Sequence, residues 1–478
     1  MVILKLKNSH KRESIEILVN SLFKYFLFLI LLNNCSLDTK SGIWTDKKDL
    51  IVEKDKVIQI LTKDELQEKV FNENLEIKLT SKLTNSSFSN NLTNNQGRIN
   101  FNGELKKISK FKFSKINNFE YYEPELIFEK NDLIFFDKKG SVIKFDPNSK
   151  IIWKKNYYNK GEKKLKPILT LGKGSETLIV ADNISKYYAL NLKDGNLLWS
   201  NYNSSPFNSQ IKIYKDKFFI IDFNNILRCF SVKDGTEFWN LKTSNTFIKS
   251  QKKLSIVVVN NVVYFNNSTG DITAVDIASG TMLWQTPTQN SKIYEDTFLL
   301  KSSNIVANKK MIIFSNNKNE FYSIDLKTGN LKWKQSINSN VQSSIVNNLI
   351  FTVTNDGFLT IIDSKTGNII RVTDIFKKEN ERSKKGFLND KKMNPLYIIF
   401  DKEIRKEKSN RPKFKPTGFM VGKNSIYLTT DHGKLYVVDT ESGKTSSIIK
   451  IDNKKISSPF VLNNNLFLIK DNSIIKLD

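Results

Sequence analysis

Cysteine and histidine are scarce in this chain. Its 478 residues contain two cysteines, Cys35 and Cys229, and two histidines, His10 and His432. Two cysteines do not make a disulfide framework, and two histidines provide neither a metal-ligand cluster nor a catalytic imidazole pair. We therefore predict no metal site and no catalytic residues.

Arginine is also scarce, although the chain is strongly basic. The net charge is +26, from 75 Lys and Arg against 49 Asp and Glu, and only seven of the basic residues are Arg. Nucleic-acid sites favour Arg because its planar guanidinium makes bidentate and stacking contacts. The lysines are spread along the chain rather than gathered in one segment, so we predict no nucleic-acid binding.

The one hydrophobic run near the N-terminus is short. It covers residues 23–32, about half the length that a transmembrane helix needs. A basic lead precedes it, and Asn33, Asn34 and Cys35 follow it, an order that is typical of an export signal. We predict a signal peptide over residues 1–34. An ordinary signal with a chance cysteine after it is the alternative.

Residues 35–103 have a polar composition. The stretch is rich in Asn, Ser, Thr and Lys, as in SSFSNNLTNNQGRIN over residues 86–100. Such a composition cannot bury enough apolar surface to fold alone. We predict a flexible tail, and we expect deletion of residues 36–100 to leave thermal unfolding nearly unchanged.

A repeated pattern fills the rest of the chain. In its clearest copy, NNSTGDITAVDIASGTMLW over residues 266–284, a strand leads into the turn Asp276–Gly280 and returns at Trp284. An Asp side chain can bond the backbone two residues on, and Gly takes the left-handed conformation that closes a hairpin. Related turns contain Asp146, Asp194, Asp234, Asp325, Asp363 and Asp439. A period of roughly 40–50 residues with several short strands predicts an all-β fold, an eight-bladed β-propeller over residues 104–478.

Five copies carry a tryptophan at the same place after the turn. These are Trp153, Trp199, Trp239, Trp284 and Trp333, whereas Arg371 and Ser447 stand there in two later copies. A large ring repeated in stacked sheets fills the wedge between neighbours. We predict that the tryptophans dock each blade against the next and bind no ligand.

Both ends of the repeat region are incomplete. The last unit stops after three strands, near residues 460–462, 466–469 and 473–477, while a lone strand near residues 110–114 precedes the first unit. Because an open sheet edge invites aggregation, we predict that the lone strand joins the last blade and closes the ring. A charged insertion over residues 374–415 interrupts the period.

The pattern Ala274-x-Asp276-x-x-Ser279-Gly280-x-x-x-Trp284 resembles the quinoprotein-type repeat. Together with a signal that ends like a lipobox at Cys35, it resembles the barrel-assembly lipoproteins of the BamB type. The resemblance implies a lipid on Cys35 and a location on the periplasmic face of the outer membrane. It also implies a scaffold, monomeric within a complex, that binds periplasmic domains of the central (BamA-type) assembly protein and aids insertion of β-barrel proteins.

Two connections between blades are candidate partner-binding segments. One follows Trp239 and contains Phe247, Ile248 and Lys249, and the other follows Trp284 and contains Tyr294, Glu295 and Asp296. Apolar anchors flanked by charge suit an interface with a small apolar centre and a polar rim. In the resembling lipoproteins, connections at corresponding places carry the partner contacts. The alternative is that Phe247 and Ile248 begin the next inner strand.

A quinone-dependent dehydrogenase of the periplasm is the rival interpretation. Such enzymes resemble this repeat, but they need an acidic calcium site, a catalytic Asp and often adjacent cysteines. Here Cys35 and Cys229 are far apart, and the acidic residues that can be placed are turn residues. An interaction propeller of the eukaryotic type would carry Gly-His and Trp-Asp signatures, which are lacking. We predict a protein without a cofactor that is not an enzyme.

Overall fold

The computed structural model describes residues 70–87, 91–244, 252–288, 301–377, 379 and 414–478. All of them belong to one structural unit, Gln67–Asp478. The predicted signal peptide, Cys35 and most of the charged insertion lie outside the described residues. In the described part, no helix is long and apolar enough to cross a membrane.

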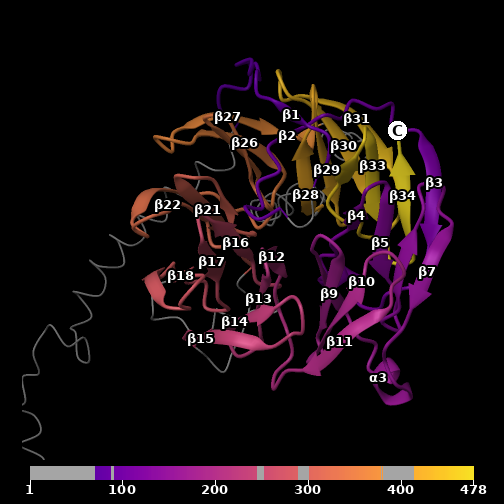
Figure 1. The fold of residues 1–478 in the computed structure, drawn as a ribbon. Coiled ribbons are helices and arrows are strands. Elements are labelled where there is room, and N and C mark those ends of the chain that lie inside the picture. Colours follow the sequence, from indigo (N-terminus) through magenta and orange to yellow (C-terminus); the bar gives the residue numbers. More distant parts are fainter. Residues whose placement is uncertain (1–69, 88–90, 245–251, 289–300, 378, 380–413) are drawn as a thin grey trace, which may run out of the picture. The chain divides into compact units, whose positions relative to one another are not determined.

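Eight antiparallel blades of four strands surround a common centre, which confirms the predicted all-β, eight-bladed propeller (Figure 1). Blades 1 to 7 run from an inner to an outer strand, and inner strands of neighbouring blades touch, as β4 and β8 do. The named helices are short: the 3-10 turn η2 (Phe119–Tyr121) and α3 (Lys160–Lys164).

The first four blades cover the first half of the repeat region. Blade 1 holds β4 (Ile127–Glu129), β5 (Asp132–Phe136), β6 (Val142–Phe145) and β7 (Ile151–Lys155). Blade 2 holds β8 (Leu169–Lys173), β9 (Thr177–Asp182), β10 (Lys186–Asn191) and β11 (Leu197–Tyr202). Blade 3 holds β12 (Lys212–Tyr214), β13 (Lys217–Ile221), β14 (Ile226–Ser231) and β15 (Glu237–Lys242). Blade 4 holds β16 (Ile256–Val259), β17 (Val262–Asn266), β18 (Ile272–Asp276) and β19 (Met282–Thr286).

The other four blades complete the ring. Blade 5 holds β20 (Val306–Ala307), β21 (Met311–Asn316), β22 (Glu320–Asp325) and β23 (Leu331–Gln335). Blade 6 holds β24 (Ser344–Val346), β25 (Leu349–Val353), β26 (Phe358–Asp363) and β27 (Ile369–Asp374). Blade 7 holds β28 (Pro416–Val421), β29 (Ser425–Thr430), β30 (Lys434–Asp439) and β31 (Thr445–Lys450). Blade 8 holds β32 (Phe460–Leu462), β33 (Asn465–Ile469), β34 (Ser473–Leu477) and β3 (Lys107–Lys112).

The apolar core is divided among the interfaces between blades. Between blades 4 and 5, for example, Val257 and Tyr264 form one buried cluster with Phe314 and Ile324. Strands in the middle of a blade are therefore apolar on both faces, like β18 with its sequence ITAVD. Because each blade packs mainly against its two neighbours, the ring behaves as a closed series of similar interfaces.

The repeated turn has the predicted chemistry. In blade 4, the Gly280 N–H donates to the Asp276 carbonyl at 2.9 Å, and Gly280 has a φ of 74°. The Asp276 side chain accepts from the backbone N–H of Ser279 at 2.8 Å. These bonds to the ionised carboxylate lower the pKa of Asp276. Asp276 is thus fixed by its turn, as the sequence predicts.

The strand predicted near residues 110–114 is observed as β3, the outer strand of blade 8. It pairs antiparallel with β34, with Phe111 opposite Ile474. Phe111 is buried in the cluster shared by blades 8, 1 and 2. The predicted pairing is therefore present, and its role in keeping the ring closed stays a prediction.

The N-terminal segment, residues 70–87 and 91–103, differs from the flexible tail predicted for 35–103. It contains β1 (Leu83–Thr84) and β2 (Arg98–Ile99), which extend blade 7 beyond its inner strand β28 (Figure 1). Ile99 and Phe101 are fully buried. The composition argument applies to a segment that folds alone, whereas this segment pairs with a sheet edge and buries Ile99 and Phe101 against the ring.

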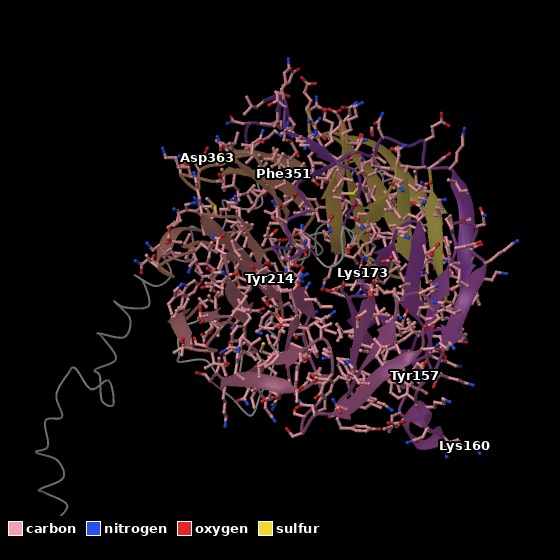
Figure 2. The ribbon with its side chains drawn as sticks, viewed as in Figure 1. Tyr157, Lys160, Lys173, Tyr214, Phe351 and Asp363 are labelled. Carbon is pink, nitrogen blue, oxygen red and sulfur yellow. The ribbon has the colours of Figure 1, made fainter. Side chains whose placement is uncertain are left out.

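A short excursion between β7 and β8 lies at the rim of the ring, where Figure 2 labels Tyr157 and Lys160. Helix α3 begins with a capping box, in which Asn159 and Glu162 each accept the other's backbone N–H. The Lys186 ammonium of blade 2 donates to the Tyr157 carbonyl at 2.7 Å and lies 3.3 Å from the Glu162 carboxylate. The excursion is therefore pinned to blade 2, away from the inner strands that carry Lys173 and Tyr214 in Figure 2.

Candidate functional site

The repeated tryptophans lie against glycines of the following blade. A Cβ at Gly280 would lie 2.7 Å from the indole of Trp239, and the Trp239 N–H donates to the Ile277 carbonyl at 3.1 Å. Equivalent ring–glycine contacts join Trp153 to Gly195, Trp199 to Gly235, Trp284 to Gly329 and Trp333 to Gly367. The rings thus occupy the wedge between blades. This position supports a docking role for the rings.

Arg371 takes the place of the tryptophan between blades 6 and 7. Its side chain is fully buried, and its guanidinium lies against Gly443. The Arg371 Nη2 donates to the Thr440 carbonyl at 3.1 Å, and Nη1 donates to the Leu75 carbonyl at 2.8 Å. Burial lowers the pKa of Arg371. One side chain therefore joins blade 6, blade 7 and the N-terminal segment.

The six predicted partner-binding residues lie outside the described part of the chain. Phe247, Ile248 and Lys249 fall in the connection between β15 and β16, and Tyr294, Glu295 and Asp296 fall between β19 and β20. Strand β16 begins at Ile256. Both segments therefore belong to connections between an outer strand and the next inner strand.

Other connections of the same type form a groove that the sequence did not reveal. Its volume is about 540 Å³, and it runs along the connections from β3 to β4, from β7 to β8 and from β31 to β32. Tyr121 is 86% exposed and Leu165 is 63% exposed at this groove. Its lysines are Lys115, Lys138, Lys166, Lys454 and Lys455. Neither exposed apolar residue belongs to a periodic pattern, so nothing in the sequence singled it out.

The centre of the ring contains Asn94 of the N-terminal segment. Its side-chain amide donates toward Gln210 Oε1 at 3.1 Å, Ser255 Oγ at 3.0 Å and the Ile305 carbonyl at 2.9 Å. Its Oδ1 accepts from the buried ammonium of Lys212 at 2.6 Å. These four residues stand at the inner strands of blades 3, 4 and 5. We call residues 91–102 the belt.

Charged residues line the cavity next to Asn94. Glu125 accepts from Lys253 at 3.2 Å and from Gln210 at 3.1 Å. Burial alone would raise the pKa of Glu123, but the ammonium groups of Lys252 and Lys455 lower it. The remaining cavity, with Asn94 and Gln96 on its wall, measures about 90 Å³. Small-molecule sites usually measure roughly 300–1,000 Å³.

The described residues do not fit a quinone–calcium centre. The belt lies along the inner strands of blades 4 to 7, and the cavity of about 90 Å³ beside it is small for a cofactor. No group of three or more His, Cys, Asp or Glu among the described residues could hold a metal ion. Cys229 is buried in β14, and burial raises the pKa of its thiol to about 12, so it carries no thiolate at neutral pH.

Comparisons with known proteins agree with this fold. Residues 138–373 match the family model described as outer membrane protein assembly factor BamB. The structure is similar to that of BamB from Moraxella catarrhalis, with a TM-score of 0.59, 14% identity, and coverage of 78% of this chain and 99% of that chain.

Two further solved structures share the fold. The computationally designed Ika8 protein has a TM-score of 0.54 at 11% identity, with coverage of 77% of this chain and 99% of that chain. Quinohemoprotein alcohol dehydrogenase from Comamonas testosteroni has a TM-score of 0.60 at 9% identity, with coverage of 83% and 81%. The comparison with curated protein sequences found no match. From its repeats, its blade count and the family match, the chain is a BamB-type protein with quinoprotein-like repeats.

Proposed function

We propose that this protein is a non-catalytic scaffold of the outer-membrane β-barrel assembly machinery. It binds periplasmic domains of the central, BamA-type assembly protein and aids insertion of β-barrel proteins. The observation that carries the proposal is the match of residues 138–373 to the BamB family model. The belt supports it, because the belt lies along the inner strands beside a cavity of about 90 Å³, so partners are expected on the outer surfaces of the propeller.

The partner surface is placed on the connections between blades. Connections can vary without disturbing the packing of the sheets, so binding residues concentrate there. We assign the apolar contact to Phe247 and Ile248 with Lys249 at its rim, and the acidic contact to Tyr294, Glu295 and Asp296. An apolar centre with a charged rim is the usual anatomy of such an interface.

The test is a pull-down of the assembly protein's periplasmic domains by the full chain. Phe247→Ala with Ile248→Ala, and Glu295→Lys with Asp296→Lys, should lose binding and keep the wild-type Tm. Glu176→Lys is the matched control, because Glu176 is an exposed acid on the turn within blade 2. Full-strength binding by both double variants would refute this surface, and Tyr121→Ser with Leu165→Ser would then test the groove.

The anchor is placed on Cys35, which would confine the ring near its partner at high effective concentration. Labelled fatty acid should enter the wild-type protein, and Cys35→Ala should move the protein to the soluble periplasmic fraction. Firm membrane association of Cys35→Ala would contradict this assignment.

A periplasmic quinone-dependent dehydrogenase is the second candidate, favoured only by the fold shared with quinohemoprotein alcohol dehydrogenase. The purified chain, given a quinone cofactor and calcium, would then reduce a dye with alcohols or sugars. We expect neither cofactor absorbance after gel filtration nor dye reduction.

A further inference from the structure

Successive belt residues contact successive blades around the channel. Leu92 O accepts from Val258 N at 2.7 Å in blade 4, and Thr93 O accepts from Ala307 N at 2.9 Å in blade 5. The Asn95 side chain accepts from Ile345 N at 2.9 Å and donates to Ile345 O at 3.1 Å in blade 6. Arg98 then pairs with Val421 in blade 7. The belt thus follows the inner wall of the ring in blade order.

The channel wall is suited to this kind of contact. Each inner strand is paired along one edge with the second strand of its blade, and the N–H and C=O groups of its other edge need partners from outside the blade. The belt supplies acceptors to several of these edges at once. At blade 7 the belt does this as the strand β2, whereas at blades 4 and 5 it uses the carbonyls of a turn that begins at Asn91.

One position of the wall is built for a carboxamide. The amide nitrogen of Asn94 faces acceptors, namely Gln210 Oε1 and the Ile305 carbonyl, while its oxygen faces the ammonium of Lys212. An apolar side chain there would leave these buried groups unpaired, and an aspartate would place negative charge against the acceptors. The wall therefore selects both the length and the polarity of the side chain.

The receptor groups at this position are also held by one another. Gln210 Oε1 accepts from Ile256 N at 3.2 Å, and Ser255 Oγ accepts from Ile305 N at 3.0 Å. These bonds link blades 3, 4 and 5 without the belt. The site is therefore organised before its occupant binds, which lowers the entropic cost of binding.

We propose that the channel wall is a binding site for a peptide segment with a side-chain carboxamide at one position, and that the belt is its resident ligand. The belt is separable, because the pairing of β3 with β34 holds the chain after it and Arg371 holds the chain before it. Its effective concentration keeps the site occupied. This inference does not depend on the proposed scaffold function.

Hydrogen exchange in the full chain tests whether the belt occupies the site on the channel wall. Asn94→Ala should speed exchange at the amides of Val258, Ala307 and Ile345 by about tenfold or more, as loss of a buried hydrogen-bonded anchor predicts. Amides of β18, which is paired on both edges, should change little. Asn100→Ala is the matched control, because its side chain donates to Asn85 Oδ1 of the same segment, at 3.1 Å, and not to an inner strand in the described part of the chain.

A synthetic peptide tests the separability. At about millimolar concentration, a peptide with the sequence of residues 91–102 should restore protection of the three inner-strand amides in the Asn94→Ala protein. The same peptide with alanine at position 94 should not. Unchanged exchange in the Asn94→Ala protein, equal loss of protection throughout the ring, or no rescue by the wild-type peptide would each overturn the proposal.

Discussion

The interfaces from blade 1 to blade 6 differ from those around blades 7 and 8. In the first set, a tryptophan of each blade lies against a glycine of the next, as Trp239 does against Gly280. The repeat therefore carries its own docking element, and each interface is made by residues close to a repeated turn.

Around blades 7 and 8 the docking element comes from elsewhere in the chain. Arg371 replaces tryptophan and bonds the Leu75 carbonyl. Ile99 and Phe101 complete the cluster between blades 7 and 8, where the Phe101 ring lies 4.9 Å from that of Tyr427. The outer strand of blade 8 is β3. A segment about 300 residues away in sequence thus fills the part of the ring where the repeat has weakened.

The two kinds of interface should contribute differently to the cooperativity of folding. Interfaces made by neighbouring repeats depend on local sequence and could form in succession. Interfaces completed by the N-terminal segment form only when distant parts of the chain meet, which costs loop-closure entropy. Three experiments separate the two kinds of interface.

Truncation should give the largest effect. Deleting residues 36–69 should leave the Tm unchanged. Deleting 36–103 should lower the Tm by about 5–10 °C, because buried hydrogen bonds and apolar contacts are lost. Deleting 36–116 should lower it further and cause aggregation, because β34 then becomes an open edge. Thermal unfolding followed by fluorescence and light scattering measures both effects.

This prediction replaces the one drawn from the sequence, that residues 36–100 can be deleted without effect. Asn94 and Ile99, which this deletion removes, make buried contacts with the ring, as does Phe101 next to it, so the deletion should destabilise the protein. Equal Tm values for the 36–69 and 36–103 deletions would show that the N-terminal segment adds nothing to stability. Equal Tm values and equal aggregation for the 36–103 and 36–116 deletions would show that β3 does not stabilise the closed ring.

Much of the fold follows from the sequence because it rests on local chemistry. The turn from Asp276 to Gly280 and the return at Trp284 identify a blade, and the missing strand of the last unit points to residues near Lys110. The belt was missed because its central residue, Asn94, is one of many asparagines in this stretch, and nothing in the sequence distinguishes it from the others. The available signal was the alternation Arg98-Ile99-Asn100-Phe101 just before β3. The groove at Tyr121 had no such signal.

Substitution of two glycines allows a direct comparison of a tryptophan interface with the arginine interface. Gly280 and Gly443 have similar φ values, 74° and 69°, so an alanine at either suffers the same backbone strain of about 1–2 kcal/mol. A methyl group at Gly280 would also meet the rigid indole of Trp239 at 2.7 Å, whereas at Gly443 it would meet the guanidinium end of Arg371 and the hydroxyl of Thr373, each at 2.9 Å.

We therefore expect Gly280→Ala to cost about 2–5 kcal/mol of unfolding free energy and Gly443→Ala about 1–2 kcal/mol. Denaturant titration monitored by tryptophan fluorescence measures both, and Gly161→Ala in the exposed helix α3 is the control for a glycine without either constraint. Equal costs at the two turns would mean that the arginine interface is as rigid as the tryptophan interfaces.

The smallest effect should be the change in unfolding free energy with pH that comes from Lys212, which donates a hydrogen bond to Asn94 of the belt. Burial lowers the pKa of Lys212 to about 8, while Glu125 opposes this shift and Lys253 adds to it. In the unfolded chain the pKa is about 10.4. Between these values the unfolded chain binds more protons, so stability rises with pH by at most about 1.4 kcal/mol per pH unit. Below pH 8 the burial penalty is fully present.

The expected gain is about 1 kcal/mol between pH 8 and pH 9.5 for the wild type relative to Lys212→Met, which has no ammonium to titrate. Tyr158 and Tyr436, whose pKa values burial raises, lower stability only as the pH passes about 10, so the window stays below that value. Unfolding free energies of both proteins across the window give the difference directly. Parallel pH profiles would mean that the Lys212 ammonium is not desolvated where it meets Asn94. The belt would then rest on its backbone contacts, on the amide nitrogen of Asn94 and on the side chain of Asn95.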